Sequence, residues 1–166
     1  PLRRQRQMCI RDRAIAMLFP ITAFAQAYVQ TWDLVDSGKH LDYDGNSTYM
    51  SYINTGAATW NAYKSGVIRK DSAFVVEDVY VSDVNASNGW AGMTYSSGKI
   101  ELNTYYMSGY SNSKKQNVAT HELGHALGLD HSTSTDVMDA AITGHTSTQA
   151  LSQNDKDSYD AAYNNY

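Results

Sequence analysis

Apolar residues recur at helical spacing in three stretches of the chain. In residues 48–64, aromatic and aliphatic side chains are three or four positions apart, which predicts an amphipathic helix. A second helix is predicted over residues 113–127, where a glycine follows the last helical position. A third is predicted over residues 151–163, with Ser152 or Asn154 as its N-cap.

Four other stretches have the pattern of β-strands. Residues 39–44 alternate enough for a short strand, and residues 74–84 are rich in Val and would form one or two strands. Two more strands are predicted over residues 89–95 and 99–106. Strands and helices alternate early and the last part is helical, so the sequence predicts an α+β fold with helices packed on a mixed sheet. We expect residues 28–166 to form one domain.

A leader of different composition precedes this domain. Residues 14–24 (AIAMLFPITAF) are apolar, follow a cluster of arginines, and end in two A-x-A cleavage patterns. The run is shorter than the roughly 20 apolar residues that span a bilayer. We expect residues 1–27 to be a signal peptide and the secreted chain to begin near Gln26 or Tyr28; a buried helix of the domain is the alternative. The residues before Met8 are expected to precede the true start of translation.

The charge of the chain limits its partners. The formal net charge is −4, and the leader, with five Arg and one Asp, contributes +4, which leaves −8 for the domain. An acidic domain disfavours nucleic acids and anionic membranes as partners, because both require a basic surface. We also expect no membrane anchor and a monomer. Cys9, within the leader, is the only cysteine, so the domain has no disulfide and no thiolate metal ligand.

The motif HELGHALGLDH, which starts at His121, carries the candidate chemistry. His121 and His125 are about 400° apart around the predicted helix, so both imidazoles project from one face. Glu122 is rotated by about 100° from His121 and would lie beside a metal without binding it. His131 would be about 240° off that face on a continuous helix. The helix must therefore end first, and Gly128 allows this because glycine accepts the left-handed conformation.

Three imidazoles with an open position for water are the ligand composition of a catalytic zinc site, although imidazole does not exclude other first-row metals. The alternative is an ordinary polar helix face. However, the surrounding residues are apolar, and an unpaired polar group in a buried face costs roughly 1–3 kcal/mol. Asp130, next to His131, is the alternative third ligand.

The motif resembles the H-E-x-x-H-x-x-G-x-x-H signature of metzincin zinc metalloproteases. Met138 lies where their Met-turn methionine is expected. The pair His131-Ser132, the GWAGMTY segment and the C-terminal LSQNDKDSYDAAY segment are most similar to the matrixin branch, in a small bacterial-type form with the catalytic domain only. The resemblance implies a twisted five-stranded mixed sheet with about three helices and a zinc cleft above the active-site helix.

The same resemblance implies roles for further residues. Gly128 and Met138 would support the site, and residues 139–146 would form the wall of the specificity pocket. The expected edge strand would bind an extended peptide through Gly89, Trp90, Ala91, Gly92 and Met93.

We therefore expect a zinc-dependent endopeptidase with one zinc ion and Glu122 as the general base. The alternative is a zinc-binding surface or interaction module without catalysis, which would be expected to have lost Glu122. Asp83, Asn85 and Asn88 offer oxygen ligands for calcium, and a surface turn rich in Asn and Asp explains them equally well.

Overall fold

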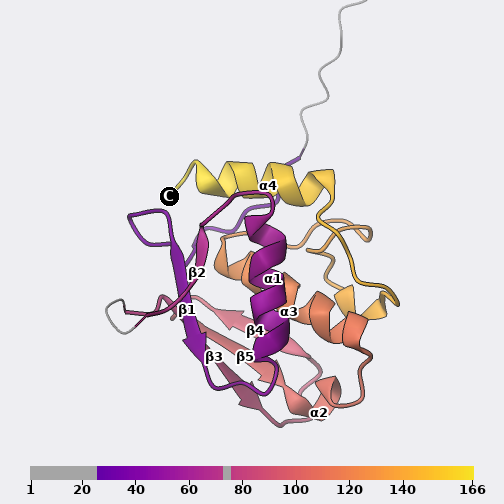
Figure 1. Cartoon of the computed structure of the whole chain (residues 1–166). Coiled ribbons are helices and arrows are strands. Elements are labelled where there is room, and N and C mark those ends of the chain that lie inside the picture. The colour runs from indigo at the N-terminus through magenta and orange to yellow at the C-terminus, as the bar shows by residue number, and fades with distance from the viewer. Residues whose placement is uncertain (1–25, 73–75) are drawn as a thin grey trace, which may run out of the picture.

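Five strands form a single sheet in the computed structural model, which describes residues 26–72 and 76–166 (Figure 1). The predicted apolar leader segment 14–24 lies outside the described residues. Within them, no helix has the length and apolar character needed to cross a bilayer. The strands are β1 (Leu41–Gly45), β2 (Ile68–Lys70), β3 (Val79–Val84), β4 (Gly92–Tyr95) and β5 (Lys99–Asn103).

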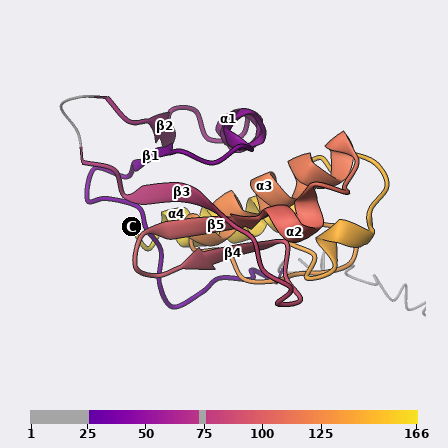
Figure 2. The same ribbon diagram turned by 90° about the horizontal axis from the view of Figure 1, so that it is seen from below.

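The sheet is mixed, with the order β2-β1-β3-β5-β4. The pairs β1–β2, β1–β3 and β3–β5 are parallel, and β4 pairs with β5 in the antiparallel direction. Figure 2 shows β2 and β4 at opposite ends of the sheet. The predicted five-stranded mixed sheet is therefore confirmed, and β4 is an edge strand with one neighbour in the described part of the chain.

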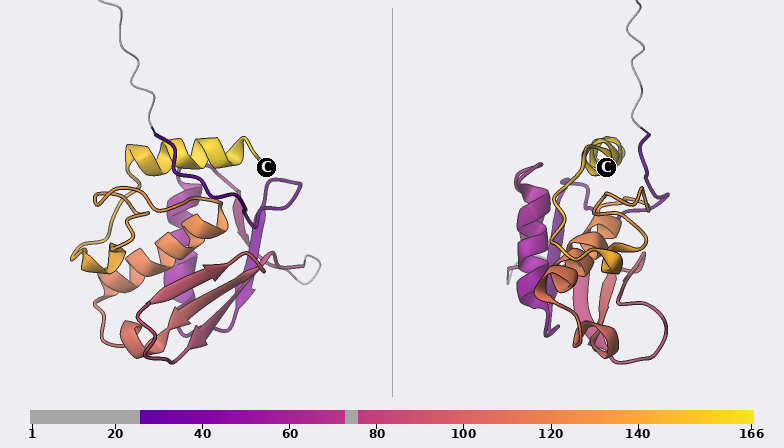
Figure 3. Two further views of the ribbon diagram at one scale, coloured as in Figure 1. Left: turned by 180° about the vertical axis from the view of Figure 1, so that it is seen from behind. Right: turned by 90° about the vertical axis from the view of Figure 1, so that its right-hand side faces the viewer.

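Four α-helices and one 3₁₀ helix complete the described fold, close to the expectation of about three helices. Helices α1 and α3 cover one face of the sheet and contact each other (Figure 3). The indole Nε1 of Trp60 in α1 donates to the backbone O of Thr120 in α3 at 2.9 Å, which fixes α3 against the core. The elements are α1 (Met50–Asn61), α2 (Thr104–Met107), α3 (Asn112–Ala126), η1 (Ile142–Gly144) and α4 (Gln153–Tyr163).

Three predicted strands are too long at one end. The strand predicted over 74–84 starts at Val79, with residues 73–75 outside the described part, and the strand predicted over 89–95 starts at Gly92. The strand predicted over 99–106 ends at Asn103, because the Asn103 side chain caps α2 by accepting from the backbone N of Tyr105 at 3.2 Å. An asparagine cap satisfies a backbone donor that would otherwise lack a partner, so the chain turns into a helix there.

The first described residues pack against the end of α3. We call residues 28–34 the N-terminal strap; it runs between α4 and the C-terminal end of α3 (Figure 3). Backbone bonds join Gln30 N to Gly128 O at 2.8 Å and Leu34 N to Ala126 O at 2.9 Å. Tyr28 N donates to Ser158 Oγ of α4 at 2.9 Å. The strap thereby connects the segment after α3 with the last helix.

Candidate active site

Helix α3 carries three of the predicted site residues on one stretch. It starts with Ser111 as N-cap, whose side chain accepts from Lys114 N at 3.3 Å. His121, Glu122 and His125 follow in its second half, and all three side chains are buried. Buried polar side chains need hydrogen-bond partners, and the neighbouring segments supply them.

The helix ends in a Schellman arrangement around Gly128. Gly128 has φ +84°, its N–H donates to His125 O at 2.9 Å, and Leu129 N donates to Gly124 O at 3.0 Å. The chain reverses there and brings His131 back over the helix. Asp130, the alternative ligand, instead accepts from the backbone N of His131 at 2.7 Å.

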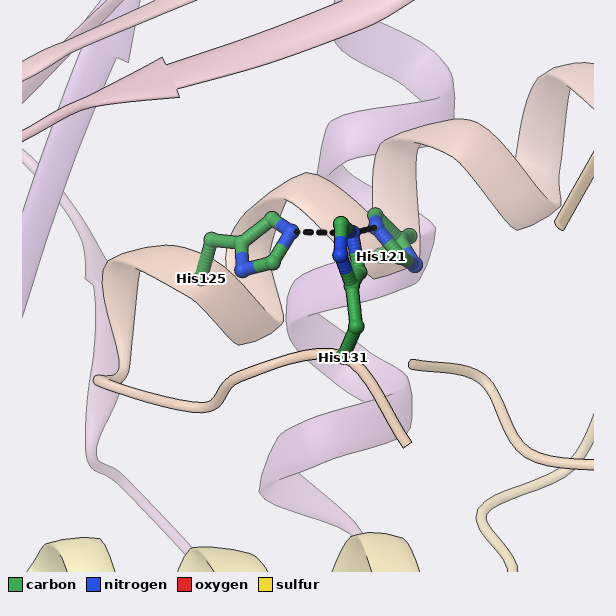
Figure 4. A group of neighbouring side chains, drawn as sticks. All are labelled: His121, His125 and His131. Carbon is green, nitrogen blue, oxygen red and sulfur yellow. Dashed lines mark hydrogen bonds between the residues drawn. The ribbon is translucent and has the colours of Figure 1, made fainter. Parts of the chain in front are cut away.

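The three imidazoles converge at their Nε2 atoms (Figure 4). His131 Nε2 lies 3.3 Å from His121 Nε2 and 3.2 Å from His125 Nε2. A tetrahedral ion with ligand nitrogens at about 2.0–2.1 Å separates those nitrogens by about 3.3 Å. The donor set therefore fits a tetrahedral zinc ion that keeps one coordination position for water.

Backbone carbonyls orient two of the rings. His121 Nδ1 donates to Val137 O and His125 Nδ1 donates to Leu129 O, both at 2.8 Å. Because a carbonyl can only accept, each Nδ1 carries the proton and each Nε2 keeps its lone pair. Burial, together with the neighbouring imidazoles, lowers the pKa of His121 to about 3 and that of His125 to about 4. Both rings are therefore neutral, as metal ligands must be.

The Glu122 side chain projects from α3 towards the edge strand β4. Burial raises the pKa of its carboxyl to about 7, against a lowering effect of the Thr94 hydroxyl, which donates to Oε2 at 2.7 Å. A Cβ placed on Gly92 would lie 2.5 Å from Glu122 Oε1. The carboxyl group thus occupies space that only a glycine in β4 leaves free.

A cleft of about 470 Å³ adjoins the histidines and Glu122. Residues 89–93, predicted from the resemblance to contact substrate, all line it, and the predicted pocket wall contributes Ala140, Ile142 and Thr143. Val118 of α3 adds a further apolar side chain. The cleft therefore combines the candidate metal ligands with an apolar wall and one strand edge.

Met138 is fully buried beneath α3. Its Sδ would lie 2.3 Å from a Cβ placed on Gly124, so the thioether packs against the helix backbone between His121 and His125. Its backbone O accepts from Ser132 N at 2.9 Å, and its N donates to Asp155 Oδ1 of α4 at 3.1 Å.

Two of the three candidate calcium ligands, Asp83 and Asn88, have partners within the protein. Asp83 accepts from Ser47 Oγ at 2.5 Å and from Thr48 N at 2.8 Å, which fixes the start of α1. Asn88 Oδ1 accepts from Asn103 Nδ2 at 2.8 Å. Asp83 belongs to β3 and Asn88 to the loop before β4, and calcium binding stays a prediction.

The sequence did not predict several residues that shape the site. Thr94, Asn103 and Asp155 are buried polar residues, and each holds another part of the cleft by hydrogen bonds. Asn103 Nδ2 contacts the carbonyls of Ala86 and Trp90 at 2.8 and 2.9 Å and so shapes the loop before β4. For Thr94 and Asn103 the one available signal was a polar residue in a predicted strand, which requires a partner if it points inward. Asp155 lies in the helix predicted over 151–163, where an acidic residue gives no such signal.

The fold and the histidine cluster define a zinc metalloprotease of the metzincin class. The sequence model of the Matrixin family matches residues 22–164, and the chain belongs to this family of zinc metalloendopeptidases.

Two solved structures are similar to the chain. Archaemetzincin from Methanopyrus kandleri is 12% identical with a TM-score of 0.55, and the alignment covers 78% of this chain and 99% of that one. This likeness shows a shared fold. High choriolytic enzyme 1, a hatching enzyme zinc-protease from the medaka fish Oryzias latipes, is 21% identical with a TM-score of 0.35, over 60% of this chain and 50% of that one. No curated protein sequence matches the chain.

Proposed function

We propose that the chain is a secreted endopeptidase in which His121, His125 and His131 bind the catalytic zinc and Glu122 is the general base. The observation that carries the proposal is the meeting of three Nε2 atoms within 4.8 Å of one another, on the wall of a cleft that also contains the Glu122 carboxyl. An adjoining base and an open coordination position distinguish a catalytic site from a structural one.

Bound zinc would lower the pKa of a water molecule and polarise the scissile carbonyl. Glu122 accepts a proton from the attacking water as its oxygen bonds to the carbonyl carbon. It then passes this proton to the departing nitrogen as the C–N bond breaks. Burial raises the pKa of the carboxyl to about 7 in the metal-free chain, and the positive charge of a bound zinc ion would favour the carboxylate form, which is the form that accepts the proton. The Thr94 hydroxyl keeps the carboxyl aimed into the cleft.

The substrate in this proposal is a peptide in extended conformation along β4. An edge strand offers backbone donors and acceptors to another chain, and residues 89–93 lie on the cleft side of the sheet edge. Main-chain pairing requires an unfolded or flexible segment, so unstructured protein is the expected substrate class.

Substitution of Glu122 tests the catalytic part of the proposal. Glu122→Gln keeps the shape but removes the base, and kcat for cleavage of an unfolded protein should fall by about 10²–10⁴-fold. Zinc content, measured in the same preparation, should stay at one ion per chain. His131→Ala is the contrasting variant and should lose zinc affinity.

Near wild-type cleavage by zinc-loaded Glu122→Gln would rule out Glu122 as the base. A wild-type chain that binds zinc at the histidines but cleaves no unfolded protein would instead support the non-catalytic binding module.

Export is the second part of the proposal and rests on the apolar segment 14–24 and the A-x-A patterns around residue 25. Tyr28 already bonds to the body of the domain through its N and O atoms, so cleavage after Ala27 would leave every described bond of the strap in place. Intact-mass measurement of material from the medium should give a chain that starts near Gln26 or Tyr28. A secreted form that retains residues 14–24 would contradict this.

A further inference from the structure

The side chain of Gln30 reaches the candidate metal site from the N-terminal strap. Its Nε2 lies 2.8 Å from His125 Nδ1, on the side of the ring away from the other imidazoles, and Gln30 also lines the cleft. The Gln30 backbone N is bonded independently to Gly128 O. The side chain can therefore be changed while the strap keeps its backbone contacts.

The two contacts of His125 Nδ1 are chemically incompatible as they stand. Leu129 O, at 2.8 Å, can only accept, so Nδ1 carries a proton. The amide Nε2 of Gln30 is also a donor, while Gln30 Oε1 is buried and has no hydrogen-bond partner among the described residues. A half-turn of the amide exchanges its O and N, which are nearly isosteric. Oε1 then faces the Nδ1 proton, and a direct conflict between two donors is replaced by one unused amide donor.

We propose that Gln30 is a positioning residue whose carbonyl oxygen, together with Leu129 O, accepts the Nδ1 proton of His125 and so selects the tautomer with a free Nε2 lone pair. The inference rests on the proposed function, in which His125 is a metal ligand. Partners of the second ring nitrogen fix both the tautomer and the ring orientation of a metal-binding histidine.

If Gln30 instead donated a hydrogen bond to His125 Nδ1, the tautomer of the ring would be the opposite one. An amide donor facing an unprotonated Nδ1 would move the ring proton to Nε2, which could then no longer bind a metal. The two orientations therefore predict opposite effects of an acceptor-only side chain at position 30.

Zinc affinity of the full chain, measured by competition with a chromophoric chelator, separates these cases. Gln30→Met keeps the length of the side chain but removes both polar groups, and should weaken zinc binding about 10–100-fold. Gln30→Glu supplies acceptors only and should bind zinc as tightly as the wild type or more tightly. Thr31→Ala, an exposed side chain of the same strap, is the matched control and should have no effect.

A second readout needs no metal. Nitrogen chemical shifts of the imidazole rings in the zinc-free chain report the tautomer, and His125 should be protonated at Nδ1 in the wild type and in Gln30→Glu. In Gln30→Met the fraction of this tautomer should fall while the thermal unfolding temperature changes little. A merely structural role of Gln30 would alter the unfolding temperature and leave the tautomer unchanged.

Unchanged zinc affinity in Gln30→Met would overturn the inference, provided that His125→Ala loses zinc, and the proposed function would stand. Equal losses in Gln30→Met and Gln30→Glu would overturn the acceptor role. If His125→Ala bound zinc as the wild type does, the proposed ligand set itself would be wrong, and the inference would fall with it.

Discussion

Two glycines, Gly124 in α3 and Gly92 in β4, stand where a methyl group would collide with a neighbouring side chain. At Gly124 a Cβ would meet Met138 Sδ at 2.3 Å and the Trp60 ring at 2.9 Å. At Gly92 it would meet three atoms of the Glu122 side chain at 2.5–2.8 Å. The first glycine lets the core pack beneath the histidines, and the second gives the carboxyl its place against β4. Their role is close approach of side chains, since neither has a positive φ.

The Gly92→Ala variant should separate catalysis from folding. The added methyl must displace the buried Glu122 side chain, because Oε1, Cγ and Cδ would all lie within 2.8 Å of it, and so moves the proposed general base away from its position. A displacement of about 1 Å at a reacting group can cost about 10²-fold in rate, so kcat should fall by about that factor at full zinc content. Gly109→Ala is the control, because a Cβ there meets only Tyr106 O, at the ordinary contact distance of 3.8 Å. Unaltered kcat in Gly92→Ala would show that the base does not depend on this contact.

At the scale of elements, periodicity predicted the long helices well. Helix α3 was expected over 113–127 and spans Asn112–Ala126, and α4 begins at Gln153 after Ser152, one of the two caps considered. Strand β2 was missed because three residues are too few for an alternating pattern. Helix α2 was missed because its cause is the side chain of Asn103, whose partners in the preceding loop are set by the tertiary fold.

In the candidate site, too, the residues set by local spacing could be predicted and those set by tertiary contacts could not. The spacing within HELGHALGLDH was enough to bring His121, Glu122 and His125 onto one helix, and Gly128 to end it, since these relations depend on local geometry alone. Thr94 and Gln30 contact those residues from positions 28 and 95 residues away in the chain. No local pattern encodes such pairs, because they arise only once strands and helices have packed.

The loop after His131 depends on the ionised side chain of Asp136. Burial would raise the pKa of this carboxyl, but hydrogen bonds, including those from Thr133 and Asn154, lower it to about 2. A carboxyl pKa below its unfolded value stabilises the fold above that value and ceases to do so as the pH falls towards 2. The difference corresponds to roughly 2 kcal/mol at neutral pH.

Urea unfolding of the zinc-free wild type and of Asp136→Asn tests this at several pH values. The variant should be less stable by roughly 2 kcal/mol at pH 7, and the two free energies of unfolding should converge between pH 4 and pH 2. Protonation of the buried histidines affects both chains alike and cancels in the comparison. A gap that stays constant over this range would mean that Asp136 acts through packing and not through its charge.

At the scale of the whole molecule, metal binding should stabilise the fold, because the three imidazoles come together only in the folded chain. Zinc at about 1,000 times its dissociation constant would add about 4 kcal/mol to the free energy of unfolding. A strong chelator should therefore lower Tm by about 10 °C for a domain of this size. His125→Ala should show a chelator-independent Tm, and an equal decrease in that variant would place the stabilising metal elsewhere.

The contact between Tyr28 and Ser158 joins residues 130 positions apart. During synthesis the strap emerges from the ribosome long before the helix α4 that receives it. Closing a loop of this length is slow, since its entropy must be lost before the contact forms. The strap can therefore dock against α4 and beside His125 only after Ser158 has been synthesised. If the chain is exported before it folds, as proposed, the contact between Gln30 and His125 forms outside the producing cell.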